Sequence, residues 1–226
     1  FAQAWPGTPD PLLPYHLASA TAQLCAGSAA IPIHDWAPQH QSWDKGTNAA
    51  FVSTHAQSGY DGATNAPLVM GYLTRSQLGF YYELASRYTI CDHYFCSVIG
   101  PTMPNRIMFM SGMLDPTGAH GGPVLETPGF DDAKAAVASV QWDTIPEVLE
   151  DTGLRCQIYQ PPGTSAGATQ DTALAAGFNV MLYFKQYVSD PASALYKKAF
   201  LPSWPDDFEQ DVKAGALPAV SWLLPP

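Results

Sequence analysis

The pattern of apolar and polar positions is clearest in the second half of the chain, where its period changes from one segment to the next. Residues 154–159 alternate apolar and polar side chains, as expected of a β-strand. Thr144-Ile145-Pro146-Glu147 has the form of a capping box at the start of a helix, and Gly153 is placed to end that helix. Further helices are expected near residues 180–188, 192–200 and 206–213, and a further strand over residues 219–224. This alternation predicts an α/β fold with a largely parallel sheet.

The first half of the chain has fewer regular segments. Residues 1–33 contain five prolines and are expected to form a loop region. A short helix is expected around residues 48–55, and a clearer one should begin with Thr74 as its N-cap and end near Arg87. Residues 88–99 are rich in β-branched and aromatic side chains, which predicts a strand or an extended approach to the core.

A break at Gly100-Pro101 separates that segment from the next expected helix. Thr102-Met103-Pro104 predicts a helix start, with Thr102 at the N-cap and a proline in the first turn. This helix should continue to Gly112, and residues 115–140 should be mostly loop.

Composition narrows the classes of function. The 226 residues carry 20 acidic and 10 basic side chains, a net charge of −10, so a nucleic-acid partner is not expected. Apolar residues make up 46% of the chain, enough for one large α/β domain, and no apolar run is long enough to span a membrane. The chain starts at Phe1 rather than Met and stops directly after the apolar run 220–224, from which we expect an internal piece of a longer protein.

The cysteines leave two alternatives open. Cys25, Cys91, Cys96 and Cys156 allow two disulfides or none, and no C-x-x-C pair or zinc-like Cys/His spacing is present. They are either buried thiols or disulfide-bonded residues of an exported protein.

The strongest candidate for chemistry is the segment from Gly100 to Arg106, Gly-Pro-Thr-Met-Pro-Asn-Arg. The common motifs of nucleotide-binding proteins, zinc proteases and serine hydrolases are missing. A helix N-terminus favours bound phosphate or an oxyanion, so the Thr102 hydroxyl is a candidate nucleophile. A hydroxyl group also needs a metal ion or a base to react. The alternative is that Thr102 only caps the helix.

Two histidines, His34 and His40, lie in a second candidate segment, residues 34–46, together with Trp36 and Trp43. Their imidazoles can converge on an anion only if the segment is a loop, because helical spacing places them on different faces. The alternative is a pair of surface histidines in a loop anchored by tryptophans. Two further histidines, His93 and His120, are weaker candidates, the first as a packed residue and the second as part of a loop.

Together these segments resemble the bacterial phospholipase C and acid phosphatase family of the alkaline-phosphatase superfamily, and the mycobacterial-type phospholipases C in particular. The resemblance runs through H-D-W-x-x-x-H-Q-S-W-D-x-G, from His34 to Gly46, and G-P-T-x-P-N-R, from Gly100 to Arg106. It continues through Trp142-Asp143-Thr144-Ile145-Pro146-Glu147 to the Val-Ser-Trp segment at residues 220–222, and so covers nearly the whole chain. The T-x-P-N-R element is similar to the nucleophile turn of this superfamily.

The resemblance implies an alkaline-phosphatase-like central sheet, mainly parallel and flanked by helices, of which this chain carries an incomplete part. The 226 residues would be an internal part of a single phosphoesterase domain, with a loop-rich phosphate-binding region over residues 1–66 and an α/β core over residues 67–226. The resemblance also implies a role for each site residue. Thr102 is the nucleophile and a metal ligand, His34 and His40 contact the phosphate, and Asn105 and Arg106 support the turn and bind substrate.

Several elements of the family pattern are absent from this sequence. They are an upstream Glu-Asn pair in a segment like E-N-R-S-F-D, a downstream Asp-Glu or Asp-Asp pair, and a Ser-Glu-His-Pro histidine after the Val-Ser-Trp strand. The first two help to bind the metal in the family. Most ligands of the implied divalent metal ion, whose identity stays open, should therefore lie outside this chain. We expect the fragment alone to be inactive.

The implied activity is that of a phospholipase C, which cleaves phosphatidylcholine-type phospholipids to diacylglycerol and a phosphorylated head group through a phospho-threonine intermediate. An acid phosphatase of the same family and an inactive relic or binding fragment stay open as alternatives. The implied partners are a phospholipid or phosphate-ester substrate and, transiently, a membrane surface. The implied location is secreted or associated with the cell envelope.

Overall fold

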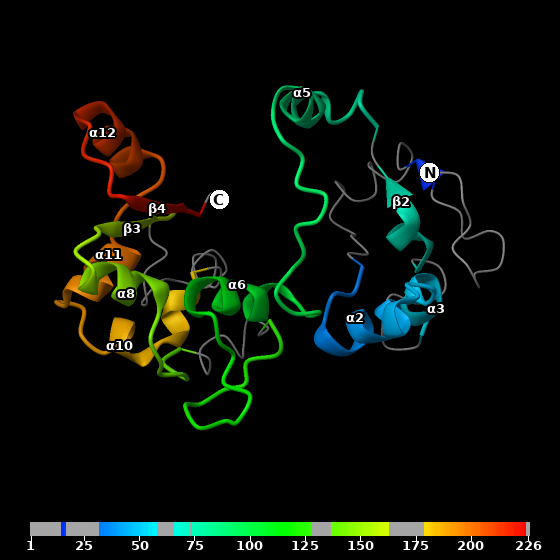
Figure 1. Cartoon of the computed structure of the whole chain (residues 1–226), viewed down its shortest axis with the longest axis horizontal. Coiled ribbons are helices and arrows are strands. Elements are labelled where there is room, and N and C mark those ends of the chain that lie inside the picture. The colour runs from blue at the N-terminus through cyan, green and yellow to red at the C-terminus, as the bar shows by residue number, and fades with distance from the viewer. Residues whose placement is uncertain are drawn as a thin grey trace. The chain divides into compact units, whose positions relative to one another are not determined.

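The computed structural model describes residues 15–16, 32–57, 66–72, 74–127, 137–162 and 179–224 (Figure 1). The chain divides into two compact units, Phe1–Pro101 and Thr102–Pro226, and we describe each by itself. The division expected near residue 66, between a phosphate-binding region and a core, stays a prediction.

The first unit is built from short helices around a small apolar core. α2 (Trp36–Trp43) continues into the 3-10 helix η1 (Asp44–Gly46), and α3 (Phe51–His55) packs against α2. The helix expected around residues 48–55 is therefore confirmed as α3. Its buried side chains pack with those of the 3-10 helix η2 (Ala66–Met70).

One strand of a short parallel pair lies in the region that was expected to be loop. β1 (Tyr15–His16) pairs in parallel with β2 (Gly71–Tyr72). The prediction of loop over residues 1–33 is wrong at these two residues, and most of that region lies outside the described residues. A strand of two residues has too few side chains to produce an alternating pattern, so the sequence carries no signal for it.

The helix expected from Thr74 begins later, as α5 (Gly79–Arg87). The Gln77 side-chain oxygen accepts hydrogen bonds from the backbone N–H of Thr74, at 2.9 Å, and from its hydroxyl, at 3.1 Å. Such side-chain bonds to the local backbone favour a turn over a helix. Thr74 therefore begins a turn, while the predicted helix end at Arg87 is confirmed.

No strand forms over the described residues 88–99, although their composition predicted one or an extended approach to the core. Tyr94 and Phe95 are 79% and 77% exposed. A strand needs a neighbour to pair its backbone N–H and C=O groups, and no strand of the described part of the chain supplies one here.

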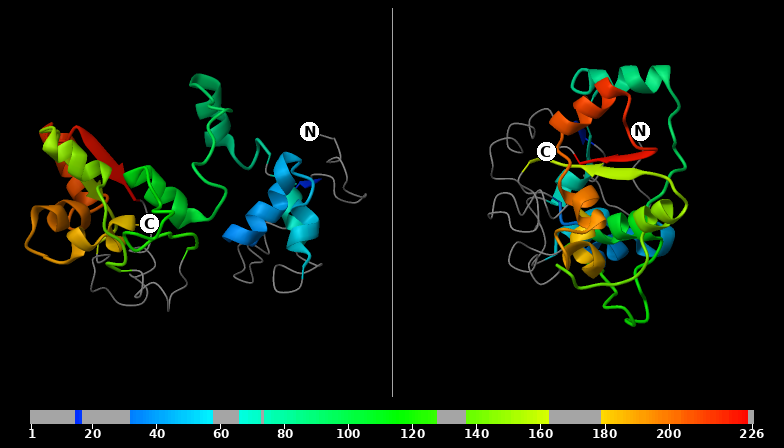
Figure 2. Two further views of the ribbon diagram at one scale, coloured as in Figure 1. Left: turned by 60° about the horizontal axis from the view of Figure 1, so that its bottom comes forward. Right: turned by 90° about the vertical axis from the view of Figure 1, so that its left-hand side faces the viewer.

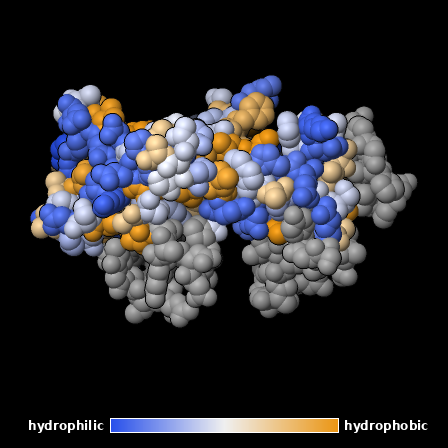
Figure 3. All heavy atoms as spheres, turned by 90° about the horizontal axis from the view of Figure 1, so that it is seen from below, coloured by the Kyte–Doolittle hydropathy of each residue, from blue (hydrophilic) through white to orange (hydrophobic). Residues whose placement is uncertain are grey.

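The surface of the protein carries apolar patches among its hydrophilic residues (Figure 3).

The second unit contains the predicted parallel sheet. β3 (Cys156–Tyr159) pairs in parallel with β4 (Val220–Leu223), with Cys156 opposite Val220 and Tyr159 opposite Leu223. Both strands confirm the segments expected from the sequence. Together with the surrounding helices, they confirm the α/β class.

Helices cover both faces of this sheet (Figure 2, right). Cys156 faces α8 (Ile145–Asp151), whose Pro146 carbonyl lies 3.7 Å from its sulfur. Tyr159 faces the other way and donates a hydrogen bond of 2.6 Å to Asp211 of α12 (Asp206–Ala214). The remaining helices of the unit are α6 (Thr102–Ser111), η3 (Val180–Tyr183), α10 (Lys185–Val188) and α11 (Ala194–Phe200).

The capping box is confirmed and connects two helices. The Thr144 backbone N–H and hydroxyl donate to Glu147 Oε2 at 3.0 and 2.7 Å, and the Thr144 hydroxyl also lies 2.7 Å from the Tyr187 hydroxyl of α10. Burial raises the pKa of Tyr187, so its hydroxyl stays protonated in this network at neutral pH. Gly153 has a φ of +78°, as predicted for the residue that ends α8.

A buried carboxylate and a glycine fix the loop that follows α6. Asp115 accepts hydrogen bonds from the backbone N–H groups of His120, at 2.7 Å, and Gly122, at 3.1 Å, which hold its pKa below the usual range despite burial. Gly121 has a φ of +94°, and a Cβ atom there would lie 2.1 Å from the Ser139 carbonyl oxygen. The loop can therefore pack against this segment only with glycine at position 121.

We expect Gly121→Ala to lower the free energy of unfolding by about 2 kcal/mol or more, because it adds a backbone clash to an unfavourable φ. Gly118→Ala is the matched control. It also has a positive φ, of +73°, but its Cβ would meet only the Gly122 oxygen at 3.5 Å, an ordinary contact. Urea unfolding of both variants measures the difference, and equal losses would show that the close approach at Gly121 does not matter.

Candidate active site

Thr102 is the first residue of α6, and its side chain is half-buried. The sequence predicted that Thr102 would be the N-cap, the residue just before the helix, whereas it is the first residue of the helix. Within the described part of the chain the Thr102 hydroxyl makes no hydrogen bond. A threonine that serves only as a cap bonds a first-turn N–H, so the geometry counts against that alternative. The hydroxyl stays open to a ligand at the positive end of a helix.

Two neighbours of Thr102 explain why the helix begins at this point. Pro104 lies in the first turn, where no intrahelical partner for an N–H group exists, so its missing N–H costs nothing. The Met103 N–H is satisfied from outside the helix by the Thr127 hydroxyl, at 3.3 Å. Ile107 is fully buried and fixes the helix against the core, and Gly112, with a φ of +70°, ends it as predicted.

Asn105 and Arg106 lie one turn further along α6, and both are half-buried. Arg106 lines a cavity with Phe109 of the same helix and Trp222 and Leu223 of β4. Burial lowers the pKa of the guanidinium from its ordinary value, although a guanidinium stays charged at any pH that proteins tolerate. The structure thus places both residues beside Thr102 on one helix, and their roles in supporting the turn and binding substrate stay predictions.

His40 is held in one orientation within α2. Its Nδ1 lies 2.8 Å from the Trp36 carbonyl oxygen, and its ring packs on the Trp36 indole with centroids 4.6 Å apart. A carbonyl oxygen only accepts hydrogen bonds, so Nδ1 carries a proton and Nε2 is the nitrogen left for a ligand. This is the arrangement expected of a histidine that binds an anion or moves a proton.

The prediction that residues 34–46 form a loop is wrong, because most of the segment is α2 and η1. Pro38 lies in the first turn of α2, where a proline is tolerated. His34 precedes the helix and is exposed, and its Nδ1 lies 3.1 Å from the Pro32 carbonyl oxygen. The Gln39 side chain donates to the His34 carbonyl oxygen, which ties the start of the segment to the helix.

Sequence reasoning missed a further histidine, His55 of α3. It is buried, with Nδ1 2.6 Å from the Phe51 carbonyl oxygen and Nε2 3.2 Å from that of Ile33. The second contact fixes the residue just before His34 against α3. No motif surrounds His55, and only the fold reveals the contact across 22 positions.

His34 and His40 belong to the first unit, whereas Thr102, Asn105 and Arg106 belong to the second. The predicted approach of His40 to Thr102 therefore stays a prediction. Within the first unit, Trp36 packs closely on Gly100, because a Cβ on Gly100 would lie 2.6 Å from the indole ring. The weaker candidates lie elsewhere in the two units, His93 in an exposed segment and His120 in the exposed loop held by Asp115.

The donors around Thr102 do not by themselves suit a divalent cation. In the ranges that the structure describes, no group of three or more His, Cys, Asp or Glu side chains is placed to hold a metal ion. One hydroxyl cannot replace the several oxygen ligands that such an ion needs. Helices of the described residues are also too short or too polar to cross a membrane.

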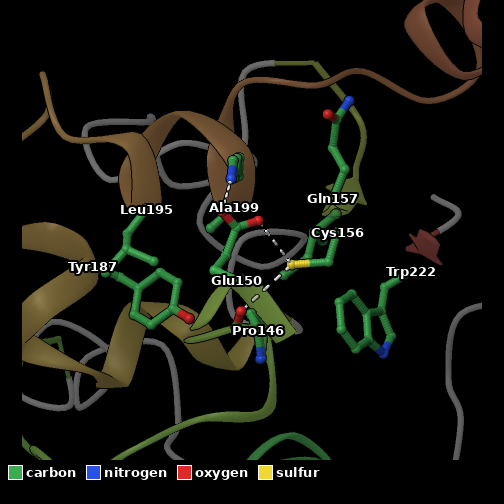
Figure 4. A pocket seen from close by; sticks show the side chains of 10 residues that line it. Pro146, Glu150, Cys156, Gln157, Tyr187, Leu195, Ala199 and Trp222 are labelled. Carbon is green, nitrogen blue, oxygen red and sulfur yellow. Dashed lines mark hydrogen bonds and ion pairs between the residues drawn. The ribbon is translucent and has the colours of Figure 1, made fainter. Parts of the chain in front are cut away.

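Cys156 lines a small pocket between β3, α8 and α11 (Figure 4). Its thiol lies 3.8 Å from Glu150 Oε1, and Glu150 forms an ion pair with Lys198. Burial, and then the Glu150 charge, raise the pKa of the thiol to about 11. Cys156 is therefore a neutral thiol at physiological pH and not a competing nucleophile. Two other cysteines, Cys91 and Cys96, are free and exposed, and Cys25 lies outside the described residues.

Because the pKa of the Cys156 thiol is raised, the free energy of unfolding should fall at alkaline pH. Its pKa is about 11 in the folded chain and near 9.0 without these surroundings. The contribution to stability is complete below pH 9 and is lost as the pH rises towards 11. The free energy of unfolding of each protein is compared with its own value at pH 7. Between pH 9 and 11 we expect it to fall by up to about 2–3 kcal/mol less in Cys156→Ala than in the unchanged protein. Parallel curves for the two proteins in urea titrations would contradict this.

The chain matches one family model and several curated proteins. The model of the Phosphoesterase family matches residues 3–226. Phospholipase C B of Mycobacterium tuberculosis (strain CDC 1551 / Oshkosh) is 37% identical over 215 residues, which cover 94% of this chain and 39% of that protein. Phospholipase C A of the same strain is 38% identical over 194 residues, 86% of this chain and 35% of that protein. The non-hemolytic phospholipase C of Burkholderia pseudomallei (strain K96243) is 37% identical over 208 residues, 85% of this chain and 27% of that protein. The chain thus spans at most 39% of the length of these relatives.

Proposed function

Because the chain belongs to the Phosphoesterase family, we propose that it is the nucleophile-bearing part of a phospholipase C with Thr102 as the nucleophile. Membership of the family supports hydrolysis of phosphoric esters. We further propose that the substrate is a phosphatidylcholine-type phospholipid. The observation that carries it is the open Thr102 hydroxyl at the first residue of α6. A helix start of this kind suits an attacking oxygen next to a phosphoryl group.

The reaction runs in two steps on this geometry. The Thr102 hydroxyl gives its proton to solvent, and its oxygen attacks phosphorus in line with the leaving oxygen, so that a new O–P bond forms as the P–O bond to diacylglycerol breaks. The partial positive charge at the start of α6 stabilises the equatorial oxygens. Water then attacks phosphorus, frees Thr102 and releases the phosphorylated head group.

His40 is the group that we propose for proton transfer. When protonated, its Nε2–H can give a proton to the leaving alcohol, while the Nδ1–H bond to Trp36 keeps the ring in place. His34 lies before the first residue of α2 rather than within the helix, and it is the second proposed contact for the phosphate.

A divalent metal ion is proposed for the longer protein, bound chiefly by residues outside this chain. The described donors do not fit such an ion, so we derive no step through it. Expressed alone, the 226 residues are proposed to have no metal-dependent phosphoesterase activity. The longer protein would act at a membrane surface transiently, and a secreted or envelope location is proposed with it.

The test is the choice of substrate by the longer protein. We expect faster release of phosphocholine from phosphatidylcholine than of nitrophenol from p-nitrophenyl phosphate. The reverse order would make the protein a phosphomonoesterase of the same family. Turnover of neither substrate, with divalent cations supplied, would overturn the proposal in favour of an inactive relic.

A further inference from the structure

An open hollow in the second unit is lined by polar and basic side chains. His120 and Gly121 of the loop after α6 contribute to one wall, and Ser139, Gln141 and Lys185 contribute to the other. Its open space of about 810 Å³ is within the range of small-molecule sites. Among the described residues that line it, none is acidic. The hollow thus offers an ammonium, an imidazole, an amide and a hydroxyl group to a ligand.

Hydrogen bonds hold both walls of this hollow in place. The Asp115 carboxylate fixes the first wall through the His120 N–H, at 2.7 Å. In the second wall, the Lys185 N–H donates to the Val140 carbonyl oxygen at 2.9 Å. The Gln141 N–H joins the two walls, because it donates to the His120 carbonyl oxygen at 3.0 Å. Groups that are fixed before a ligand arrives lose little conformational entropy when it binds.

Lys185 and His120 have the charge and the hydrogen-bond donors that an anion needs. In the part of the chain that the structure describes, the Lys185 ammonium forms no ion pair and the His120 ring makes no hydrogen bond. By contrast, Lys198 in the same unit is paired with Glu150. The chain carries 20 acidic against 10 basic side chains, so most basic groups can find an acidic partner. Lys185 instead lines the hollow.

The buried Asp115 carries the opposite charge, which acts against a bound anion. Its carboxylate accepts hydrogen bonds from three backbone N–H groups of the loop and from the Thr117 hydroxyl, and it is not among the residues that line the hollow. These donors stabilise the carboxylate in its place. The charge at the wall of the hollow is therefore that of Lys185.

We propose that this hollow binds a phosphate-type anion, with Lys185 and His120 as its principal ligands. The ammonium supplies the charge, and an imidazole N–H supplies a directed hydrogen bond to a phosphate oxygen. Gln141 and Ser139 are further donors from the second wall. An anionic lipid head group and free phosphate present the same oxygens to these groups. The inference is independent of the proposed function, because none of these residues has a role in turnover there.

Magnetic resonance of the His120 ring tests the proposal in the longer protein. With histidine rings labelled, the His120 signal is the one that is absent from His120→Gln. Inorganic phosphate, added at constant pH and ionic strength, should shift this signal until the site is saturated. No shift, or the same shift with chloride in place of phosphate, would overturn the proposal.

Lys185→Gln and Lys197→Gln are the matched pair of variants. Each removes one positive charge from the second unit, but Lys197 is an exposed residue of α11 outside the hollow. We expect Lys185→Gln to raise the phosphate concentration at half saturation by about tenfold or more, and Lys197→Gln by less than about twofold. Lys185→Arg keeps the charge and should still bind. Equal effects of the two glutamine variants, or loss of binding in neither, would contradict a site at Lys185.

Vesicles distinguish the two sources of the phosphate group. The longer protein with Thr102→Val, which should not consume the lipid, is sedimented with phosphatidylcholine vesicles that contain or lack phosphatidylglycerol. If an anionic lipid head group is the ligand, phosphatidylglycerol increases the bound fraction, and Lys185→Gln reverses this increase while Lys197→Gln does not. Saturable binding of inorganic phosphate with no effect of Lys185→Gln on sedimentation identifies free phosphate as the ligand. Neither phosphate binding nor an effect of Lys185→Gln on sedimentation would overturn the proposal.

Discussion

Replacing Thr102 with valine in the longer protein is expected to reduce turnover to less than about one thousandth of the unchanged enzyme, because the attacking oxygen is removed. The shape of the side chain is kept, and the lost hydroxyl makes no hydrogen bond within the described residues. The free energy of unfolding should therefore fall by less than about 1 kcal/mol, at the low end of the cost of a lost cap. Steady-state kinetics and urea unfolding measure the two effects.

Two variants separate chemistry from structure at this position. Thr102→Ser keeps an oxygen at the same place and should retain part of the activity. Thr127→Val removes the hydroxyl that accepts the Met103 N–H, so it weakens the helix start but leaves the nucleophile in place. Activity close to that of the unchanged enzyme in Thr102→Val would mean that Thr102 has only a structural role.

His40→Ala is expected to lower kcat/KM of the longer protein by roughly 10²–10⁴-fold, the range for a lost general acid or charge partner. The contribution should be larger in the transition state than in the ground state, because charge develops on the leaving oxygen. The melting temperature should change little, since the ring is only half-buried and its Nε2 is not used in packing.

The control for His40 is an amide of similar reach. His40→Asn can still donate to the Trp36 carbonyl oxygen, which Nδ1 contacts at 2.8 Å, but it cannot give a proton from the Nε2 position. It should lose activity like alanine while keeping the local helix. If both variants keep kcat/KM within a few fold, the His34–Gly46 segment is only a packed surface element.

Much of the second unit could be predicted because its signals are local. The capping box at Thr144, the glycine at position 153 and the alternation over residues 154–159 each depend on residues close in sequence, and the structure has all three. The direction of pairing between β3 and β4 followed from the order of helices and strands. The first three of these features follow from local sequence alone.

The errors come from contacts that depend on distant residues. A loop over residues 34–46 was inferred because His34 and His40 can converge on an anion only in a loop, whereas most of the segment folds as α2 and η1. The β-branched and aromatic residues over 88–99 indicated a strand or an extended approach to the core, but a strand forms only where another strand pairs with it, and Tyr94 and Phe95 are exposed. The position of His55 against Ile33 and the packing of Trp36 on Gly100 depend on the fold, so no motif could reveal them.

Trapping the covalent intermediate tests the role of Thr102 most directly. The longer protein would be mixed with a phosphatidylcholine substrate, quenched in acid during turnover, digested and examined by mass spectrometry. We expect one added phosphocholine group, joined through phosphorus to the Thr102 oxygen, on the peptide that contains Thr102, located there by fragmentation and absent from Thr102→Val. Full turnover with no phosphocholine group on Thr102, or with the group on another residue, would contradict the assignment of Thr102 as the nucleophile.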